Sequence, residues 1–160
     1  MLKFFRNHFG MVVSIIIALI LSLCMSATAT VKTALMAGAA VQLETLVRNW
    51  GTAFLVIMLI SVFLPVKMWG DQFAAAVKLR HNTLPFGLVS NLIPTLFYNT
   101  GATLVLVGVN VGFSAPYYWA AVAGDYLLMF VISYVLSLVA ERLGMVIAQK
   151  ACLPTGGLHL

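Results

Sequence analysis

Four long hydrophobic segments follow one another along the chain, with shorter polar stretches between them. They cover about residues 9–30, 51–68, 84–111 and 117–139. At a rise of 1.5 Å per residue, a helix of about 20 residues crosses the hydrocarbon core of a bilayer, which is about 30 Å thick. The pattern therefore predicts an all-α membrane protein with four transmembrane helices.

The aromatic residues and the connectors support these boundaries. Trp50 and Trp69 flank the second segment, and residues 117–119 place a Tyr-Tyr-Trp cluster at the start of the fourth, as in an aromatic belt at a membrane surface. The first connector, residues 31–49, is too polar to cross, but its hydrophobic residues lie largely on one side of a helix. It predicts either a helical extension or a helix lying in the interface.

Composition excludes a soluble protein. Of 160 residues, 62% are hydrophobic and 8% charged, and the mean hydropathy is +1.06, whereas soluble domains are roughly 45–50% apolar and about 25% charged. We therefore expect a single membrane domain over residues 1–160. The net charge of +5 does not indicate nucleic-acid binding, because the basic residues are scattered and no nucleic-acid motif is present.

The positions of the basic residues predict the orientation. If all four segments cross, Lys32 and Arg48 lie on one side, and seven of the nine basic residues lie on the other: Lys3, Arg6, Lys67, Lys78, Arg80, Arg142 and Lys150. Basic residues concentrate in cytoplasmic loops. We therefore expect both termini in the cytoplasm and the protein in the inner (plasma) membrane of a bacterium.

The two halves of the chain share one order of features. Each has a Phe-Gly pair, a hydrophobic helix, a connector and a second helix that opens with Trp50 or Trp119. Because a two-helix unit returns the chain to its starting side, the halves would be parallel repeats related by an axis along the membrane normal. The units cover about residues 9–75 and 84–147.

The first unit resembles a known family. Met25-Ser26 in the first helix, Trp50 at the start of the second and Pro65 near its end are similar to the bacterial two-helix membrane units grouped under domain of unknown function 2798. The resemblance covers about residues 9–75, and the second unit has no proline at the corresponding position. It implies a small inner-membrane protein without an established activity, and so bears on topology more than on function.

Asp125 is the only acidic residue well inside a predicted span. It follows Pro116 by about nine residues, which places it about 13 Å below the outer interface, near the bilayer centre. A central Asp costs roughly 2.5–3.5 kcal/mol to insert. We therefore expect Asp125 to face the interior of the bundle and to have bonding partners there.

The third segment supplies such partners. Tyr98 lies beside a stripe of polar residues that recur at every fourth position: Asn91, Thr95, Asn99 and Thr103. Asn99 has a depth similar to that of Asp125, which predicts a hydrogen bond between them. Pro94 removes one backbone hydrogen bond and frees the carbonyl of Ser90. This predicts a helix kink at Pro94 and a small polar cavity near mid-membrane.

Two functional hypotheses follow. In the first, the protein is a small transporter or channel for a small solute or ion, in which Asp125 exchanges a proton or binds a cation. Its candidate binding residues are Asp125, Asn99, Asn91, Tyr98 and Thr95. In the second, these side chains only tie helices or subunits together, and the protein is a non-catalytic structural or accessory subunit of a larger complex. Replacement of Asp125 by Asn separates the two.

Other residues predict packing and association. Close helix contact of the small-xxx-small type is expected at Ser22, Ser26 and Thr30, and at Ala120 and Gly124. Four thin spans enclose little interior, so we expect a homo-oligomer or contact with other membrane subunits, in addition to the lipid bilayer. The sequence holds no nucleophile–base set, phosphate loop or paired carboxylates, and its histidines and cysteines lack the spacing of metal ligands. We therefore expect no enzyme activity, cofactor or metal.

Overall fold

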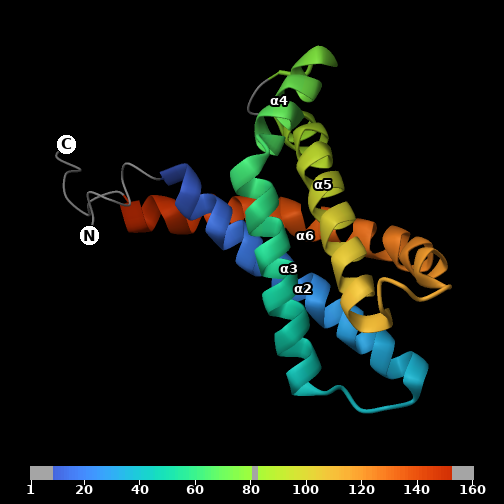
Figure 1. Ribbon diagram of the computed structural model, residues 1–160. Coiled ribbons are helices and arrows are strands. Elements are labelled where there is room, and N and C mark those ends of the chain that lie inside the picture. Colours follow the sequence, from blue (N-terminus) through green and yellow to red (C-terminus); the bar gives the residue numbers. More distant parts are fainter. Residues whose placement is uncertain (1–8, 81–82, 153–160) are drawn as a thin grey trace.

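The computed structural model describes residues 9–80 and 83–152 (Figure 1). Lys3, Arg6 and the three histidines, on which parts of the sequence predictions depend, lie outside these ranges. The described residues form five helices joined by short turns: α2 (Phe9–Ala37), α3 (Leu43–Phe63), α4 (Val66–Ala76), α5 (Leu84–Val111) and α6 (Tyr118–Cys152).

Four of these helices contain segments that are long and apolar enough to cross a membrane: Val13–Ala37, Leu43–Phe63, Leu84–Val111 and Tyr118–Gly144. The shortest has 21 residues, which corresponds to about 31 Å of helix. The prediction of an all-α membrane protein with four transmembrane helices is confirmed. The helix α4, with 11 residues, is too short to cross.

The four long helices form a closed ring. α2 packs against α3 and α6, and α5 packs against the same two helices, so the first and last helices of the chain are neighbours (Figure 1). Each neighbouring pair is antiparallel. Gly144 near the end of α6 lies against Val13 and Ile17 near the start of α2, for example, and Gly101 of α5 lies against Ile60 of α3.

The ring has two ends. We call the first the α4 end, because α4 lies there between the end of α3 and the start of α5. Lys67 of α4 contacts Glu141 in the later part of α6, and Gly144 of α6 lies against the start of α2. The opposite end holds the end of α2, the start of α3, the end of α5 and the start of α6. The first helix of each half, α2 or α5, packs against the second helix of both halves, α3 and α6. This order is the one expected of parallel repeats, although the repeat itself stays a prediction.

The two halves differ where α3 ends. Leu64 adopts an extended conformation (ψ 128°) directly before Pro65, and α4 begins at the next residue. A proline disfavours the helical conformation of the residue that precedes it, so the helix breaks here. No proline lies within Tyr118–Cys152, and α6 continues without a break for 35 residues.

The helix ends correct the predicted boundaries of the first connector. α2 continues to Ala37 and α3 begins at Leu43, so the connector is a pair of helical extensions rather than an interfacial helix. Only residues 38–42 lie outside the two helices. Gly38 has a φ of +61°, a conformation that glycine adopts without strain at the end of a helix. As a consequence Lys32 lies inside α2.

The core lies where the four long helices meet. Its fully buried hydrophobic residues are small or medium-sized: Ala18, Leu21, Met25, Ala29, Ala53, Ile57, Ala102, Leu106 and Met129. Hydrogen bonds accompany this packing between α2 and α3. The Trp50 indole Nε1 donates to Ser22 Oγ at 3.1 Å, the Ser26 hydroxyl donates to the carbonyl of Leu46 at 2.9 Å, and Asn49 Nδ2 donates to Thr30 Oγ1 at 3.1 Å.

The small-residue prediction is therefore confirmed for α2, where Ser22, Ser26 and Thr30 are buried. It is not met within the chain for α6. Ala120 and Gly124 are exposed, and no described side chain lies within 4 Å of where a Cβ on Gly124 would be. This face of α6 is free of contacts with the other described helices.

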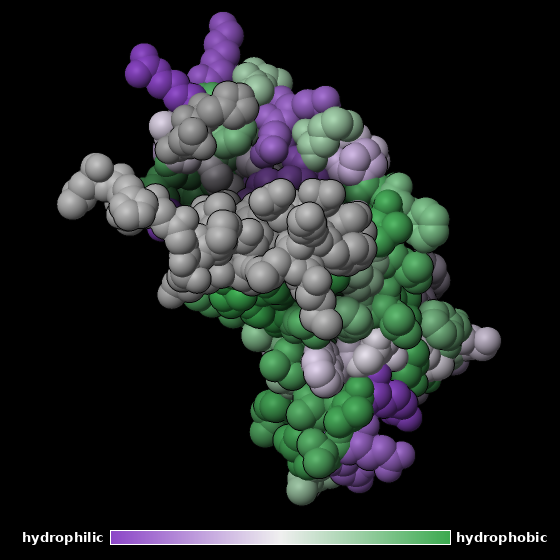
Figure 2. Space-filling model, turned by 90° about the vertical axis from the view of Figure 1, so that its left-hand side faces the viewer, coloured by the Kyte–Doolittle hydropathy of each residue, from purple (hydrophilic) through white to green (hydrophobic). Residues whose placement is uncertain are grey.

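The outer surface is hydrophobic around the middle of the bundle. Figure 2 shows hydrophilic residues gathered at the height of α4 and again toward the opposite end, with hydrophobic side chains between them. Large hydrophobic side chains are exposed on every long helix, including Leu23, Leu55, Leu96 and Leu127. Such a surface would be unfavourable in water and is suited to lipid.

Candidate functional site

A buried line of polar side chains runs between α5 and α6, and we call it the polar seam. It consists of the four-residue stripe of α5 and two serines of α6: Asn91, Thr95, Asn99, Thr103, Ser133 and Ser137. Asn91 Nδ2 donates to Ser137 Oγ at 2.5 Å, and the Thr95 and Ser137 hydroxyls are 3.0 Å apart. The seam therefore joins the two helices through side-chain hydrogen bonds in a low-dielectric interior.

Asn99 lies in the middle of the seam and is fully buried. Its Nδ2 donates to the carbonyl of Tyr126 at 3.4 Å, and its Oδ1 accepts from Ser133 Oγ at 3.5 Å. The predicted hydrogen bond to Asp125 is wrong, because both polar atoms of this amide are directed to other groups. Tyr98 faces away from the seam, and its hydroxyl accepts from Ser61 of α3 at 3.0 Å.

Asp125 instead forms an ion pair with Lys32 of α2. Each of these side chains is about a quarter exposed. Lys32 is five residues from the end of α2 and Asp125 is seven residues from the start of α6, which correspond to about 8 and 10 Å of helix. The sequence predicted that Asp125 lies near the bilayer centre. In the structure the ion pair lies closer to the opposite end of the bundle.

Pairing explains how these charges are tolerated inside the apolar segments. A lone carboxylate or ammonium is costly at membrane depth, and charged residues there pair with one another. The expectation that Asp125 has a bonding partner holds, but the partner is a lysine that the sequence placed in a loop. The error came from ending the first span near residue 30, whereas the helix continues to Ala37.

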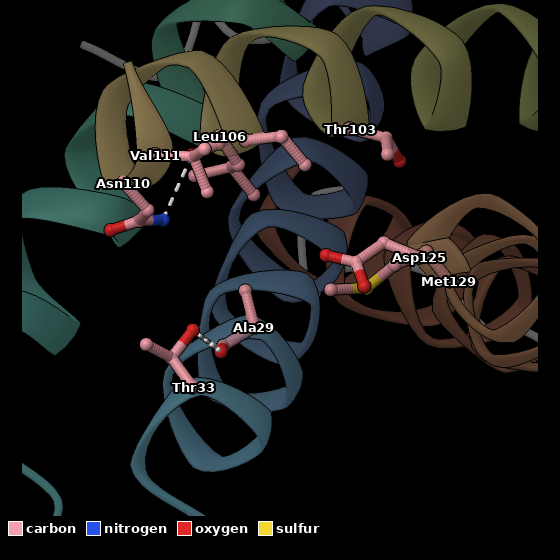
Figure 3. Close-up of a pocket in the computed structure, with 9 residues that line it drawn as sticks. Ala29, Thr33, Thr103, Leu106, Asn110, Val111, Asp125 and Met129 are labelled. Carbon is pink, nitrogen blue, oxygen red and sulfur yellow. Dashed lines mark hydrogen bonds between the residues drawn. The ribbon is translucent and has the colours of Figure 1, made fainter. Parts of the chain in front are cut away.

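A small cavity lies beside Asp125 (Figure 3). Its volume is about 40 Å³, and it is lined by Ala29, Thr33, Thr103, Leu106, Val107, Asn110, Val111, Asp125 and Met129. In Figure 3 the side chains of Asp125 and Met129 reach from α6 toward α2. A space of this size holds about one water molecule, and an ion stripped of most of its hydration is of similar size.

Some of the polar groups around the cavity have hydrogen-bond partners, and one does not have a partner among the described residues. The Thr33 hydroxyl donates to the carbonyl of Ala29, and Asn110 Nδ2 donates to the carbonyl of Leu106. Thr103 is 1% exposed, and its hydroxyl has no hydrogen-bond partner among the described residues. A buried hydroxyl without a partner carries a desolvation cost. Thr103 Oγ1 is therefore an available ligand in the cavity that Asp125 also lines.

The cavity is displaced from its predicted position. The sequence placed it beside Pro94, between Asn91, Asn99 and Asp125. In the structure the serines of α6 fill that space, and the cavity lies farther along α5, at Thr103.

The Ser90 carbonyl that Pro94 leaves without a helical hydrogen bond is in contact with α4. α5 is continuous from Leu84 to Val111, and the predicted kink stays a prediction. The Ser90 carbonyl that Pro94 frees is covered by Gly70 of α4, where an added Cβ would lie 2.0 Å from the carbonyl oxygen. Such close contact is possible because glycine lacks a side chain, and a Cα–H group approaches a carbonyl oxygen favourably.

A second charged cluster lies at the α4 end. Lys67 of α4 contacts Glu141 of α6, and its Nζ is 3.8 Å from Asp71 of the same helix. The Ser90 hydroxyl of α5 donates to Asp71, and Lys67 Nζ donates to Ser90 Oγ at 3.4 Å. The cluster joins α4, α5 and α6, and its one lysine and two carboxylates give a net charge of −1.

Sequence reasoning missed this cluster. Lys67 was used only to predict orientation, and neither Asp71 nor Glu141 was considered as a partner. The spacing of Lys67 and Asp71, four residues apart, is a signal for a pair on one helix face. The contact with Glu141 joins residues 74 positions apart, and no local pattern could have indicated it.

The polar seam extends between the two charged sites. From Ser90 in the α4-end cluster to Thr103 beside Asp125, α5 advances 13 residues, or about 20 Å. A polar residue of α5 faces the bundle at each turn of this interval. The arrangement is a buried polar line with a carboxylate–lysine site at either end.

Comparison of the chain with protein-family models, curated protein sequences and solved structures yields no match. The resemblance of the first unit to domain of unknown function 2798 stays a prediction.

Proposed function

We propose that the protein is a small transport protein of a bacterial inner membrane that moves a proton or a small monovalent cation, with Asp125 as the exchanging carboxylate. The observation that carries this proposal is the position of Asp125. Its carboxylate is neutralised by Lys32 and lines the same cavity as the Thr103 hydroxyl, which has no hydrogen-bond partner among the described residues. No catalytic step is part of the proposal.

Lys32 acts in this proposal as a tethered cation. While Asp125 is charged and empty, the Lys32 ammonium neutralises it, so no uncompensated charge lies at membrane depth. A proton or a small cation that binds Asp125 takes over this role and releases the ammonium. The site offers one carboxylate and hydroxyl oxygens, and hard oxygen ligands with a single negative charge suit a monovalent cation.

The polar seam supplies the route across the bundle. Hydroxyl and amide groups at successive turns of α5 replace part of the hydration of a moving ion or hold the water that carries a proton. The two charged sites mark its ends, and the cluster of Lys67, Asp71 and Glu141 is the exchange point at the α4 end. Side chains of the seam must open during transport, because Asn99 and Thr95 are buried.

The charge distribution supports a cytoplasmic α4 end. Among the described residues, Lys67, Lys78, Arg80, Arg142 and Lys150 belong to that end, whereas Lys32 and Arg48 belong to the opposite end. Basic residues tend to remain on the cytoplasmic side. The start of α2 and the end of α6 therefore face the cytoplasm, and both termini lie on that side.

Flux through reconstituted liposomes tests the proposal. We expect the wild-type protein to dissipate an imposed pH or cation gradient and Asp125→Asn to abolish the flux. Glu44→Gln is the matched control, because Glu44 is an exposed carboxylate at the same end of the bundle. Lys32→Gln removes the tethered competitor and should lower the cation concentration for half-maximal flux. Equal flux for wild type and Asp125→Asn would refute the proposal.

A second candidate function is supported by a different observation. Asn91, Thr95 and Asn99 are sealed by contacts within the bundle, as expected of side chains that tie helices together. The face of α6 at Ala120 and Gly124 is exposed and small, as expected where another membrane subunit or a second copy packs. An accessory subunit of this kind would show no flux as wild type, and Asp125→Asn would reduce its assembly instead.

A further inference from the structure

A large groove lies on the outside of the bundle, between α2 and α6, and faces the lipid. Its volume is about 490 Å³, and it is lined by Ala27, Thr28, Val31, Lys32, Leu35, Met36 and Leu128. This volume is within the roughly 300–1,000 Å³ of typical small-molecule sites. The walls are apolar apart from Thr28 and Lys32, and Thr28 donates its hydroxyl proton to the carbonyl of Cys24 in its own helix.

Lys32 separates this groove from the cavity inside the bundle. Lys32 lines the groove and Asp125 lines the cavity, so their ion pair forms the partition between the two spaces. An ammonium group has three N–H donors, and the contact with Asp125 uses one of them. Lys32 is the one charged residue among the groove's lining side chains. The groove thus combines apolar walls with an ammonium group that is paired with Asp125 and keeps two further N–H donors.

We propose that the groove binds one anionic phospholipid, with an acyl chain along Val31, Leu35 and Leu128 and the headgroup phosphate accepting a hydrogen bond from Lys32. The two remaining N–H donors of Lys32 favour a ligand with an anionic acceptor over a cationic amphiphile. The depth fits as well. Lys32 is about 8 Å of helix from the end of α2, and a lysine at such depth extends its ammonium toward the headgroups.

Bound lipid has a consequence for the ion pair. The phosphate and the Asp125 carboxylate then share one ammonium, which weakens the hold of Lys32 on Asp125. The lipid would therefore favour the state in which the carboxylate is free for another cation. The lipid site itself does not depend on the proposed transport function, because the groove and its charge are present whether or not Asp125 carries an ion.

Lipid binding to the full chain in detergent tests the proposal. Native mass spectrometry with equimolar phosphatidylglycerol and phosphatidylcholine should show about fivefold preference for phosphatidylglycerol in the first bound lipid, as expected for one lysine near the membrane surface. Lys32→Gln/Asp125→Asn should abolish this preference while keeping a neutral hydrogen-bonding pair. Arg48→Gln, which changes an exposed basic residue at the same end, should retain it.

A second pair of variants tests the groove without touching the charges. Leu128→Trp fills the groove and should lose the retained phosphatidylglycerol, whereas Leu127→Trp changes a neighbour that is 71% exposed and does not line it. Equal retention by the two tryptophan variants would overturn the proposal. So would equal binding of the two phospholipids by the wild type, or displacement of phosphatidylglycerol by an equimolar long-chain fatty acid.

Discussion

The contact between α4 and α5 makes a sharp prediction for Gly70→Ala. The added Cβ would lie 2.0 Å from the Ser90 carbonyl oxygen and 3.0 Å from Cδ of Pro94, where ordinary contacts begin at 3.4 Å. α4 must therefore move by about 3.4 − 2.0 = 1.4 Å, because the opposing atoms belong to the backbone and a proline ring. Inserting a methyl group into a packed contact typically costs about 1–3 kcal/mol.

This cost is measurable as a change in thermal stability. For a chain of this length about 1 kcal/mol corresponds to about 2–4 °C, so we expect the melting temperature of Gly70→Ala to fall by about 2–12 °C. Tryptophan fluorescence in detergent micelles is a suitable assay, since Trp69 packs against Phe97 at 5.5 Å between ring centroids. Gly51→Ala is the control, as no atom lies within 4 Å of its added Cβ. Equal melting temperatures for the two variants would refute the close contact.

Three further predictions concern the ion pair, the polar seam and the exposed face of α6. Asp125→Asn and Lys32→Gln should each destabilise the protein by about 1–3 kcal/mol, because each single change leaves an unpaired charge. The double variant should lose less than the sum of the two, and additive changes in the free energy of unfolding would contradict the ion pair. Asn99→Leu should cost between about 0.6 kcal/mol, the average for hydrogen bonds between transmembrane helices, and about 1.7 kcal/mol, the maximum. Unchanged denaturation by dodecyl sulfate would count against these bonds. Gly124→Leu should shift a homo-oligomer toward monomer in cross-linking experiments while Ala123→Leu does not, and equal cross-linking would exclude this face as the interface.

The helices could be predicted from the sequence, but their ends could not. Hydropathy identifies which residues prefer lipid, and this property located all four spans. A helix does not stop where the lipid stops, however, and α2 and α3 continue into the region that hydropathy assigned to a connector. Pro65 was noted as a feature of the second span, and the structure shows that it ends α3 and begins a separate helix, α4.

The candidate site was predicted as a set of residues but not as a set of contacts. The stripe from Asn91 to Thr103 follows from helical spacing alone, and all four of its residues are buried. The partners of Asp125 and Lys67 depend on the register between helices that are far apart in the chain. Lys32 and Asp125 are separated by 93 positions, and only the packed bundle determines that they meet.

The ring formed by the helices has a consequence for how the chain can be divided. Since α2 and α6 are neighbours, every long helix packs against two others. The ring of four helices therefore does not depend on the covalent connection between α4 and α5. Two separate polypeptides, one ending after α4 and one starting at α5, would present the same surfaces to each other. A gene split at this connection, or a fusion of two ancestral hairpin genes, would preserve the architecture.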